Sequence, residues 1–130
     1  MKNICKVLVV MLLGTILVSC GVEELSDNFN EGTLREAVEN IVDELNNQKY
    51  EEIVVDGIEE VKGEKNVNAI KETWEKVTKN LGKYEKIEKM VFQEKDDLAI
   101  VISVLKFEKG KVQLTTTFNK ENKLAGIFMK

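Results

Sequence analysis

Apolar residues recur at helical spacing in the first part of the chain and alternate with polar residues in the second part. Thr33 and Glu36 have the spacing of a capping box, so the pattern predicts a first helix that begins at Thr33 and ends near residues 46–47. A further helix is predicted over residues 67–80, where a glycine follows in a position to end it. The β-branched residues 53–55 and the glycine behind them predict only a short or broken helix between these two.

After residue 82 the period changes from helical to alternating, which is typical of strands. Four segments carry this pattern: residues 84–93, 98–107, 112–118 and 124–129. We expect two-residue turns at Lys109-Gly110 and Glu121-Asn122, because glycine and asparagine tolerate the left-handed backbone of tight turns. Helices followed by an antiparallel meander define an α+β fold, with N-terminal helices packed on a four-stranded antiparallel sheet.

These turns set a register in which Ser103 faces Thr116 and Val101 faces Phe118. One face of the sheet is then almost wholly apolar and is expected to lie against the helices, where it meets Trp74. The opposite face carries four apolar side chains among polar ones, namely Ile100, Ile102, Val104 and Phe128. Because a partly apolar patch of this kind often marks a partner surface, we expect a homodimer or a protein partner to use this face.

The N-terminal residues have the layout of a secretory signal peptide, with a basic start and an apolar run over residues 7–18 that is too short to span a bilayer. Residues 17–20, Leu-Val-Ser-Cys, resemble the lipobox of bacterial lipoprotein precursors, in which cleavage precedes the cysteine and the thiol carries a diacylglyceryl group. The expected organisation is a signal peptide over residues 1–19, lipidated Cys20 with a flexible tether over residues 20–32, and one domain over residues 33–130. The predicted location is the extracytoplasmic face of the cell membrane, where the lipid anchors the protein.

Composition excludes several classes of function. The formal net charge is −4, and Arg35 is the only arginine, so a nucleic-acid partner is not expected. The chain has no histidine, and its two cysteines, Cys5 and Cys20, belong to the signal peptide and the lipid site. The domain therefore lacks the commonest general base, a cysteine nucleophile and thiolate zinc ligands, and we expect neither a metal nor a cofactor.

The chain resembles a family of Gram-positive lipoproteins and secreted proteins whose domain has no assigned function. The resemblance covers about Thr33 to Lys130 and rests on these structural motifs: Tyr50, Trp74, Leu81-Gly82-Lys83-Tyr84, Phe107-Glu108-Lys109-Gly110, and Phe118 through Gly126-Ile127-Phe128. That family is placed in the nuclear-transport-factor-2-like, or cystatin-like cone, superfamily. The resemblance implies a curved four-stranded antiparallel sheet around three helices, often with a cavity, and it implies no catalytic residue. The superfamily hosts isomerases, hydrolases, transport factors and assembly domains, so the fold does not decide the function.

Four residues are candidates for lining such a pocket: Trp74, Tyr84, Ser103 and Thr116. Trp74 is either a ligand platform or, as we expect for an aromatic residue on an apolar helix stripe, part of the core. Tyr84 with Glu88 would supply a phenol and a carboxylate for proton transfer, and the alternative is a surface tyrosine beside a solvated glutamate. Ser103 and Thr116 either orient a ligand or hydrogen-bond to each other across two strands.

Two functions remain at this point. The first is a membrane-anchored, non-catalytic module that binds a small apolar ligand, a peptide or a partner protein outside the membrane. The second is a small cofactor-independent pocket enzyme of isomerase or hydrolase type, which requires an acid and a phenol that converge in a cavity. The residue types favour the first function.

Overall fold

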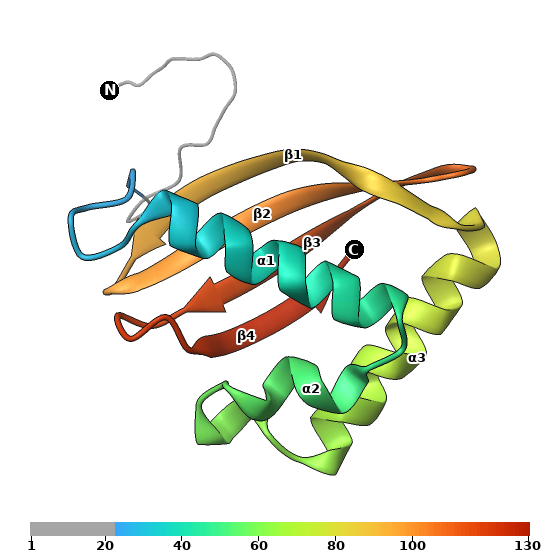
Figure 1. The fold of residues 1–130 in the computed structure, drawn as a ribbon, viewed down its shortest axis with the longest axis horizontal. Coiled ribbons are helices and arrows are strands. Elements are labelled where there is room, and N and C mark those ends of the chain that lie inside the picture. The colour runs from blue at the N-terminus through green and yellow to red at the C-terminus, as the bar shows by residue number, and fades with distance from the viewer. Residues whose placement is uncertain (1–22) are drawn as a thin grey trace, which may run out of the picture.

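A computed structural model describes residues 23–130, and it places helices before a four-stranded antiparallel sheet, which confirms the predicted α+β class (Figure 1). The elements are α1 (Glu31–Asn46), α2 (Tyr50–Val55), the 3-10 helix η2 (Glu59–Val61), α3 (Glu64–Leu81), β1 (Tyr84–Lys95), β2 (Leu98–Phe107), β3 (Gly110–Phe118) and β4 (Leu124–Met129). The predicted signal peptide and Cys20 lie outside the described residues.

The helices gather on one side of the sheet, and α1 crosses it with its apolar stripe turned inward (Figure 1). The stripe consists of Leu34, Val38, Ile41, Val42 and Leu45, all of which are buried. The predicted start of this helix at a Thr33 capping box is wrong, because Asn30 is the N-cap and its side-chain oxygen accepts from the Thr33 N–H at 2.9 Å. Asparagine is among the strongest N-caps, so the helix begins at Glu31.

The strands follow the order β1-β2-β3-β4 in an open sheet. Between β3 and β4 the register set by the predicted turn is confirmed at Leu114–Met129 and Thr116–Ile127. A shift then pairs Phe118 with Leu124 instead of Ala125, so the predicted two-residue turn at Glu121-Asn122 is wrong. Asn122 has φ 64°, the left-handed conformation expected for it in the turn.

The predicted register between β2 and β3 is wrong by two residues. Phe107 pairs with Gly110, so Glu108 and Lys109 form the turn, and Ser103 faces Leu114 instead of Thr116. Contact with the end of α3 fixes the position of this turn, because the Lys109 N–H donates to the Leu81 carbonyl at 2.8 Å. A Cβ on Gly110 would lie 3.1 Å from a Leu81 methyl group, so this glycine permits close packing against α3. Since side chains alternate with a period of two, the shift leaves every residue on its predicted face.

The segment before α1 is not a free tether, which corrects the predicted boundary at residue 33. Glu23 pairs with Glu94 at the end of β1 through two backbone hydrogen bonds, and the Ser26 N–H donates to the Glu94 carboxylate at 2.8 Å. Phe29 is 9% exposed and belongs to the core, and Leu25 packs against the core. These two apolar side chains hold an otherwise polar segment on the domain from Glu23 onward.

Candidate functional site

The outer face of the sheet, opposite the helices, carries one row of side chains that crosses all four strands. The register aligns Val91 with Ile102, Ile102 with Thr115, and Thr115 with Phe128. Phe128 is 55% exposed, whereas Val91 and Ile102 are half-buried by their neighbours in the sheet. We call Val91, Ile100, Ile102, Val104 and Phe128 the outer-face patch. The structure therefore brings together the four residues predicted for a partner face and adds one more.

Sequence reasoning missed Val91 because β1 does not keep a simple alternation. Two register shifts, between Tyr84 and Lys86 and between Ile87 and Lys89, each place an additional residue in the strand. Each bulge changes which face of the sheet the following residues occupy, so the face on which Val91 lies depends on how β1 pairs with β2.

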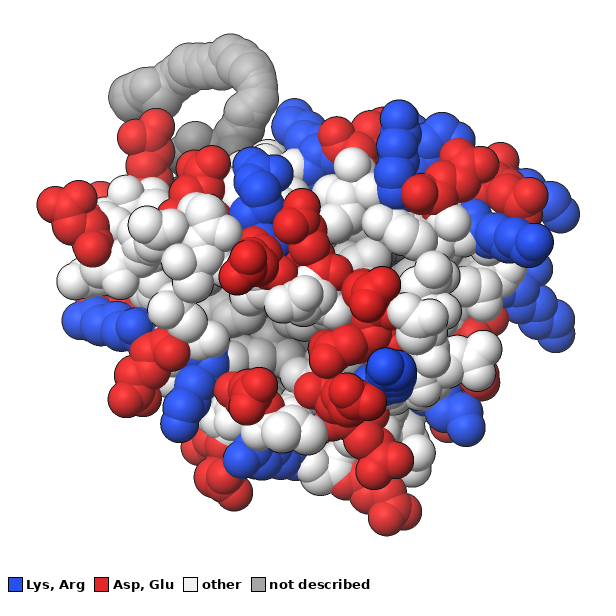
Figure 2. All heavy atoms as spheres, viewed as in Figure 1, with Lys and Arg blue, Asp and Glu red and all other residues white. Residues whose placement is uncertain are grey.

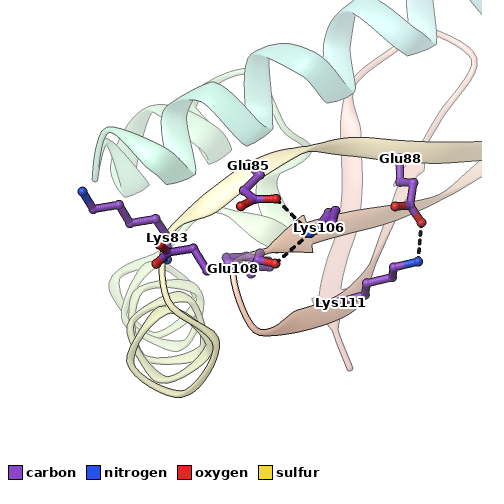
Figure 3. Close-up of polar contacts among 7 residues, drawn as sticks. Lys83, Glu85, Glu88, Lys106, Glu108 and Lys111 are labelled. Atoms are coloured by element: carbon purple, nitrogen blue, oxygen red, sulfur yellow. Dashed lines mark hydrogen bonds and ion pairs between the residues drawn. The ribbon is translucent and has the colours of Figure 1, made fainter.

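One end of the outer face carries ion pairs (Figure 3). Lys106 lies 2.9 Å from the Glu85 carboxylate, and Lys111 lies 2.6 Å from the Glu88 carboxylate. The hydrogen bond from Lys111 holds the pKa of Glu88 below its usual range, and the bond to Glu85 raises the pKa of Lys106. Glu88 thus pairs with Lys111 on the outer face, as the alternative of a solvated glutamate expects, and not with Tyr84.

Trp74, Tyr84 and Phe107 form an aromatic cluster on the inner side of the sheet. The Trp74 ring lies 5.4 Å from the Phe107 ring and 6.2 Å from the Tyr84 ring, between centroids. Trp74 is 3% exposed, which confirms its assignment to the core. Trp74 also lines, with Tyr50 and Tyr84, a surface pocket of about 410 Å³ whose wall includes Glu75. Burial raises the pKa of both tyrosines, with a further contribution from Glu75 at Tyr50.

Ser103 and Thr116 lie in the core and do not line the pocket of Trp74 and Tyr84. Both are fully buried, and the Thr116 hydroxyl donates to the Val101 carbonyl at 3.4 Å. The Ser103 hydroxyl has no hydrogen-bond partner among the described residues. The predicted hydrogen bond between these two side chains is therefore wrong, and the structure separates them from Trp74 and Tyr84 at the pocket.

A second hollow lies between α1, α2 and the β3–β4 turn, and acidic side chains gather around it (Figure 2). This acidic cleft has a volume of about 350 Å³ and includes Asp43, Glu44, Glu52 and Asp56, with Lys49 among them. Burial raises the pKa of Glu44, and the neighbouring carboxylates raise it further. Among residues 23–130, no group of three or more histidine, cysteine, aspartate or glutamate side chains is arranged to hold a metal ion. Sequence reasoning missed this cleft because the acids come from two helices whose contact is tertiary.

A third hollow, of about 360 Å³, runs beside β4 between that strand and the helices η2 and α3. Ala69, Ile70 and Thr73 of α3 form one wall, and Ile127 and Met129 lie on the β4 side. We call this hollow the edge groove.

No helix in the described part of the chain is long and apolar enough to cross a membrane.

These features define an open-faced α+β domain, with three α-helices and one 3-10 helix on one side of an antiparallel meander and a partly apolar sheet face on the other. Residues 38–127 match the family described as "Protein of unknown function (DUF3887)", and the chain belongs to that family. A protein from Ruminococcus gnavus ATCC 29149, solved by NMR, is similar in fold, with a TM-score of 0.68 and 19% identity over 83% of this chain and 97% of that one. No curated protein matches the chain.

Proposed function

We propose that this protein is a lipid-anchored, extracytoplasmic lipoprotein of the Gram-positive type whose cone-like domain is a non-catalytic binding or assembly module. The observation that carries the proposal is the outer-face patch, which lies on the side of the sheet away from the helices. The helices-then-meander order supports placing the domain in the nuclear-transport-factor-2-like superfamily. In such a module the anchor sets the location and the sheet face makes the contact.

Because Glu23 is bonded to β1, the linker between the lipid and the domain would be short. Only two residues separate Cys20 from Glu23, and an extended chain over that interval spans about 10 Å. The end of the sheet that carries Glu94, Asp96 and Asp97 would therefore stand next to the lipid headgroups. Its acidic side chains would be repelled by anionic lipids, so the lipid chains supply the attachment.

Membrane fractionation of Cys20→Ala tests the anchor. We expect the variant to lose incorporation of labelled lipid and to accumulate as uncleaved precursor or as released protein. The matched control is Cys5→Ala, which changes the other cysteine and should leave lipidation intact. Unchanged fractionation and cleavage of Cys20→Ala, with no lipid label on the wild type, would show that there is no lipobox.

Self-association through the outer-face patch is the simplest use of this surface. Full burial of an apolar side chain contributes at most about 1.5–3 kcal/mol, and these side chains are already partly covered. Association consumes about 4–15 kcal/mol, so we expect any self-association to be no tighter than micromolar. Thr115 and Thr117 would lie at the seam and Lys106 at its rim.

Sedimentation at increasing concentration tests this association. Phe128→Lys and Ile102→Lys should keep the protein monomeric, because each would place a charge within the apolar contact. Val55→Lys is the matched control, since Val55 is 59% exposed but lies on α2, away from the patch. A wild type that is monomeric at millimolar concentration would reject self-association and leave a different protein as the partner.

A second candidate function is capture of a small, largely apolar ligand at the pocket of Trp74, Tyr50 and Tyr84. A tyrosine phenol is protonated at neutral pH, and burial moves the pKa of both phenols further above that range, so both can donate a hydrogen bond, which is also what a pocket enzyme would need. Trp74 is the only tryptophan, so its fluorescence reports directly on this pocket. Binding of the uncharged probe N-phenyl-1-naphthylamine should change that fluorescence in the wild type and not in Glu75→Arg, whose longer charged side chain would fill the apolar pocket. Glu72→Arg on the same helix should behave as wild type.

A further inference from the structure

Strand β4 presents an open row of backbone hydrogen-bonding groups. Gln113 and Lys130 exchange two backbone hydrogen bonds, of 2.9 and 3.0 Å, which identifies them as a hydrogen-bonded pair of the antiparallel ladder. Because such pairs alternate, Thr115 and Phe128 form the next one, and the N–H and C=O groups of Ile127 and Met129 point away from β3. These groups lie at the free edge of the sheet, since β4 is its last strand.

The edge groove lies along this open edge. On the side away from β3 it is bounded by η2, which contacts β4, and by α3. Figure 1 shows α3 on the β4 side of the sheet. The Leu124 carbonyl is already occupied, because it accepts from the Ile58 N–H at 2.9 Å. The open part therefore runs from about Ala125 to Met129, which is the length of a typical short strand.

We propose that the edge groove binds an extended peptide segment of a partner protein, which adds to β4 as a fifth strand. The peptide backbone would bond to Ile127 and Met129, and small side chains on one of its faces would pack against Ala69 and Thr73. Glu60 is the only charged residue of the groove wall, so the peptide should carry a lysine or arginine opposite it.

The shape of the groove favours a single extended segment over a second copy of this chain. The edge of β4 is recessed behind α3 and η2, because residues of both helices share the groove with the strand. A second copy would bring the same helices beside its own β4, and the two walls would meet before the strands could pair. This inference goes beyond the proposed function and does not depend on the anchor or on pairing through the outer-face patch.

Selection from a phage-displayed library of random nonapeptides, with the full chain immobilised in mild detergent, tests the proposal. We expect enrichment of peptides that alternate small residues with β-branched or aromatic residues and carry one basic residue. The peptide that binds most tightly is then synthesised in two N-methylated forms. Each form carries methyl groups on every second backbone amide, and the two forms differ in which alternate set is methylated. Methylation of the set that donates to β4 should weaken binding by about two- to twelvefold per hydrogen bond lost, and methylation of the other set should not.

Ala69→Arg blocks the groove with a bulky cation, and we expect it to weaken peptide binding more than about tenfold. Asn68→Arg is the matched control, because the neighbouring residue is also exposed on α3 but does not line the groove. Phe128 lines the groove and also belongs to the outer-face patch, whereas Ile102 belongs to the patch alone. Ile102→Lys should therefore bind the peptide as the wild type does, which distinguishes the groove from the rest of the patch.

Three outcomes would overturn the proposal. One is the absence of enriched peptides, and another is enriched peptides that bind Ala69→Arg and Asn68→Arg equally well. The third is a concentration-dependent dimer that Ala69→Arg abolishes, which would assign the groove to a second copy of this chain.

Discussion

Glu23 and Glu94 exchange two backbone hydrogen bonds, with N···O distances of 2.9 and 2.7 Å, and so join the segment before α1 to the end of β1. The Glu94 side chain adds a third link, because its carboxylate accepts from the Ser26 N–H. These links bring the start of the described chain to the sheet end that carries the turn at Asp96 and Asp97. The orientation proposed at a membrane depends on this attachment.

The Glu94 link should depend on pH. The hydrogen bond from Ser26 holds the pKa of Glu94 below its ordinary value of 4.5, so the ionised form favours the attached segment. This stabilisation is fully present above pH 4.5 and is lost as the pH falls through the lowered pKa. We expect the hydrogen-exchange protection factor of the Glu23 amide to be constant between roughly pH 5 and pH 7 and to decrease at lower pH, as Glu94 becomes protonated.

Glu94→Gln should lower the protection of the Glu23 amide at neutral pH and remove its pH dependence. Glu24→Gln is the control and should retain both, because the Ser26 N–H donates to the Glu94 carboxylate and not to that of Glu24. Protection in Glu94→Gln that still falls with acid would assign the pH dependence to another group.

Trp74→Ala should destabilise the domain by about 3–5 kcal/mol, the range for truncating a large buried aromatic side chain. Its ring packs on both Tyr84 and Phe107, so a cavity would open between α3 and the sheet. Denaturant unfolding followed by circular dichroism measures the loss, and Lys76→Ala on the exposed side of α3 should change stability little. A loss under about 1 kcal/mol would contradict the core assignment.

Ser103→Ala should leave stability unchanged or raise it by up to about 1 kcal/mol. The serine hydroxyl is buried without a partner, and an unsatisfied buried hydroxyl is destabilising. Thr116→Ala should instead cost about 1–2 kcal/mol, because it removes a buried methyl group and the hydrogen bond to Val101. Thermal unfolding of the two variants side by side measures the contrast, and a clear loss in Ser103→Ala would indicate a partner such as a buried water.

Glu44→Gln should stabilise the domain at neutral pH. Burial and the neighbouring carboxylates raise the pKa of Glu44 above 4.5, so the folded state disfavours its ionised form and loses stability as the pH rises through that range. We expect a gain of about 0.2–1 kcal/mol at pH 7, typical of a partly exposed charge interaction, and no gain at pH 4. Glu36→Gln, on α1 outside the acidic cleft, is the control, and an equal gain there would indicate a general charge effect.

Local patterns predicted the elements of this fold because helices and strands differ in their side-chain period. The stripe from Leu34 to Leu45 is apolar at helical spacing, and the alternation from Leu98 to Phe107 assigns each residue of β2 to one face. Four of the five outer-face residues could be predicted for the same reason. Asn122 was predictable because few residues accept a left-handed turn position.

Only the tertiary structure decided the features that depend on contacts between distant segments. A shift of two residues between β2 and β3 satisfies the same alternation, and packing of Gly110 on Leu81 selects one register. The bulges of β1 place Val91 on the outer face through pairing with β2, and the acidic cleft exists only because α1 and α2 meet. A local pattern specifies period and face, whereas register, bulges and clefts depend on the free energy of contacts that form when the chain is folded.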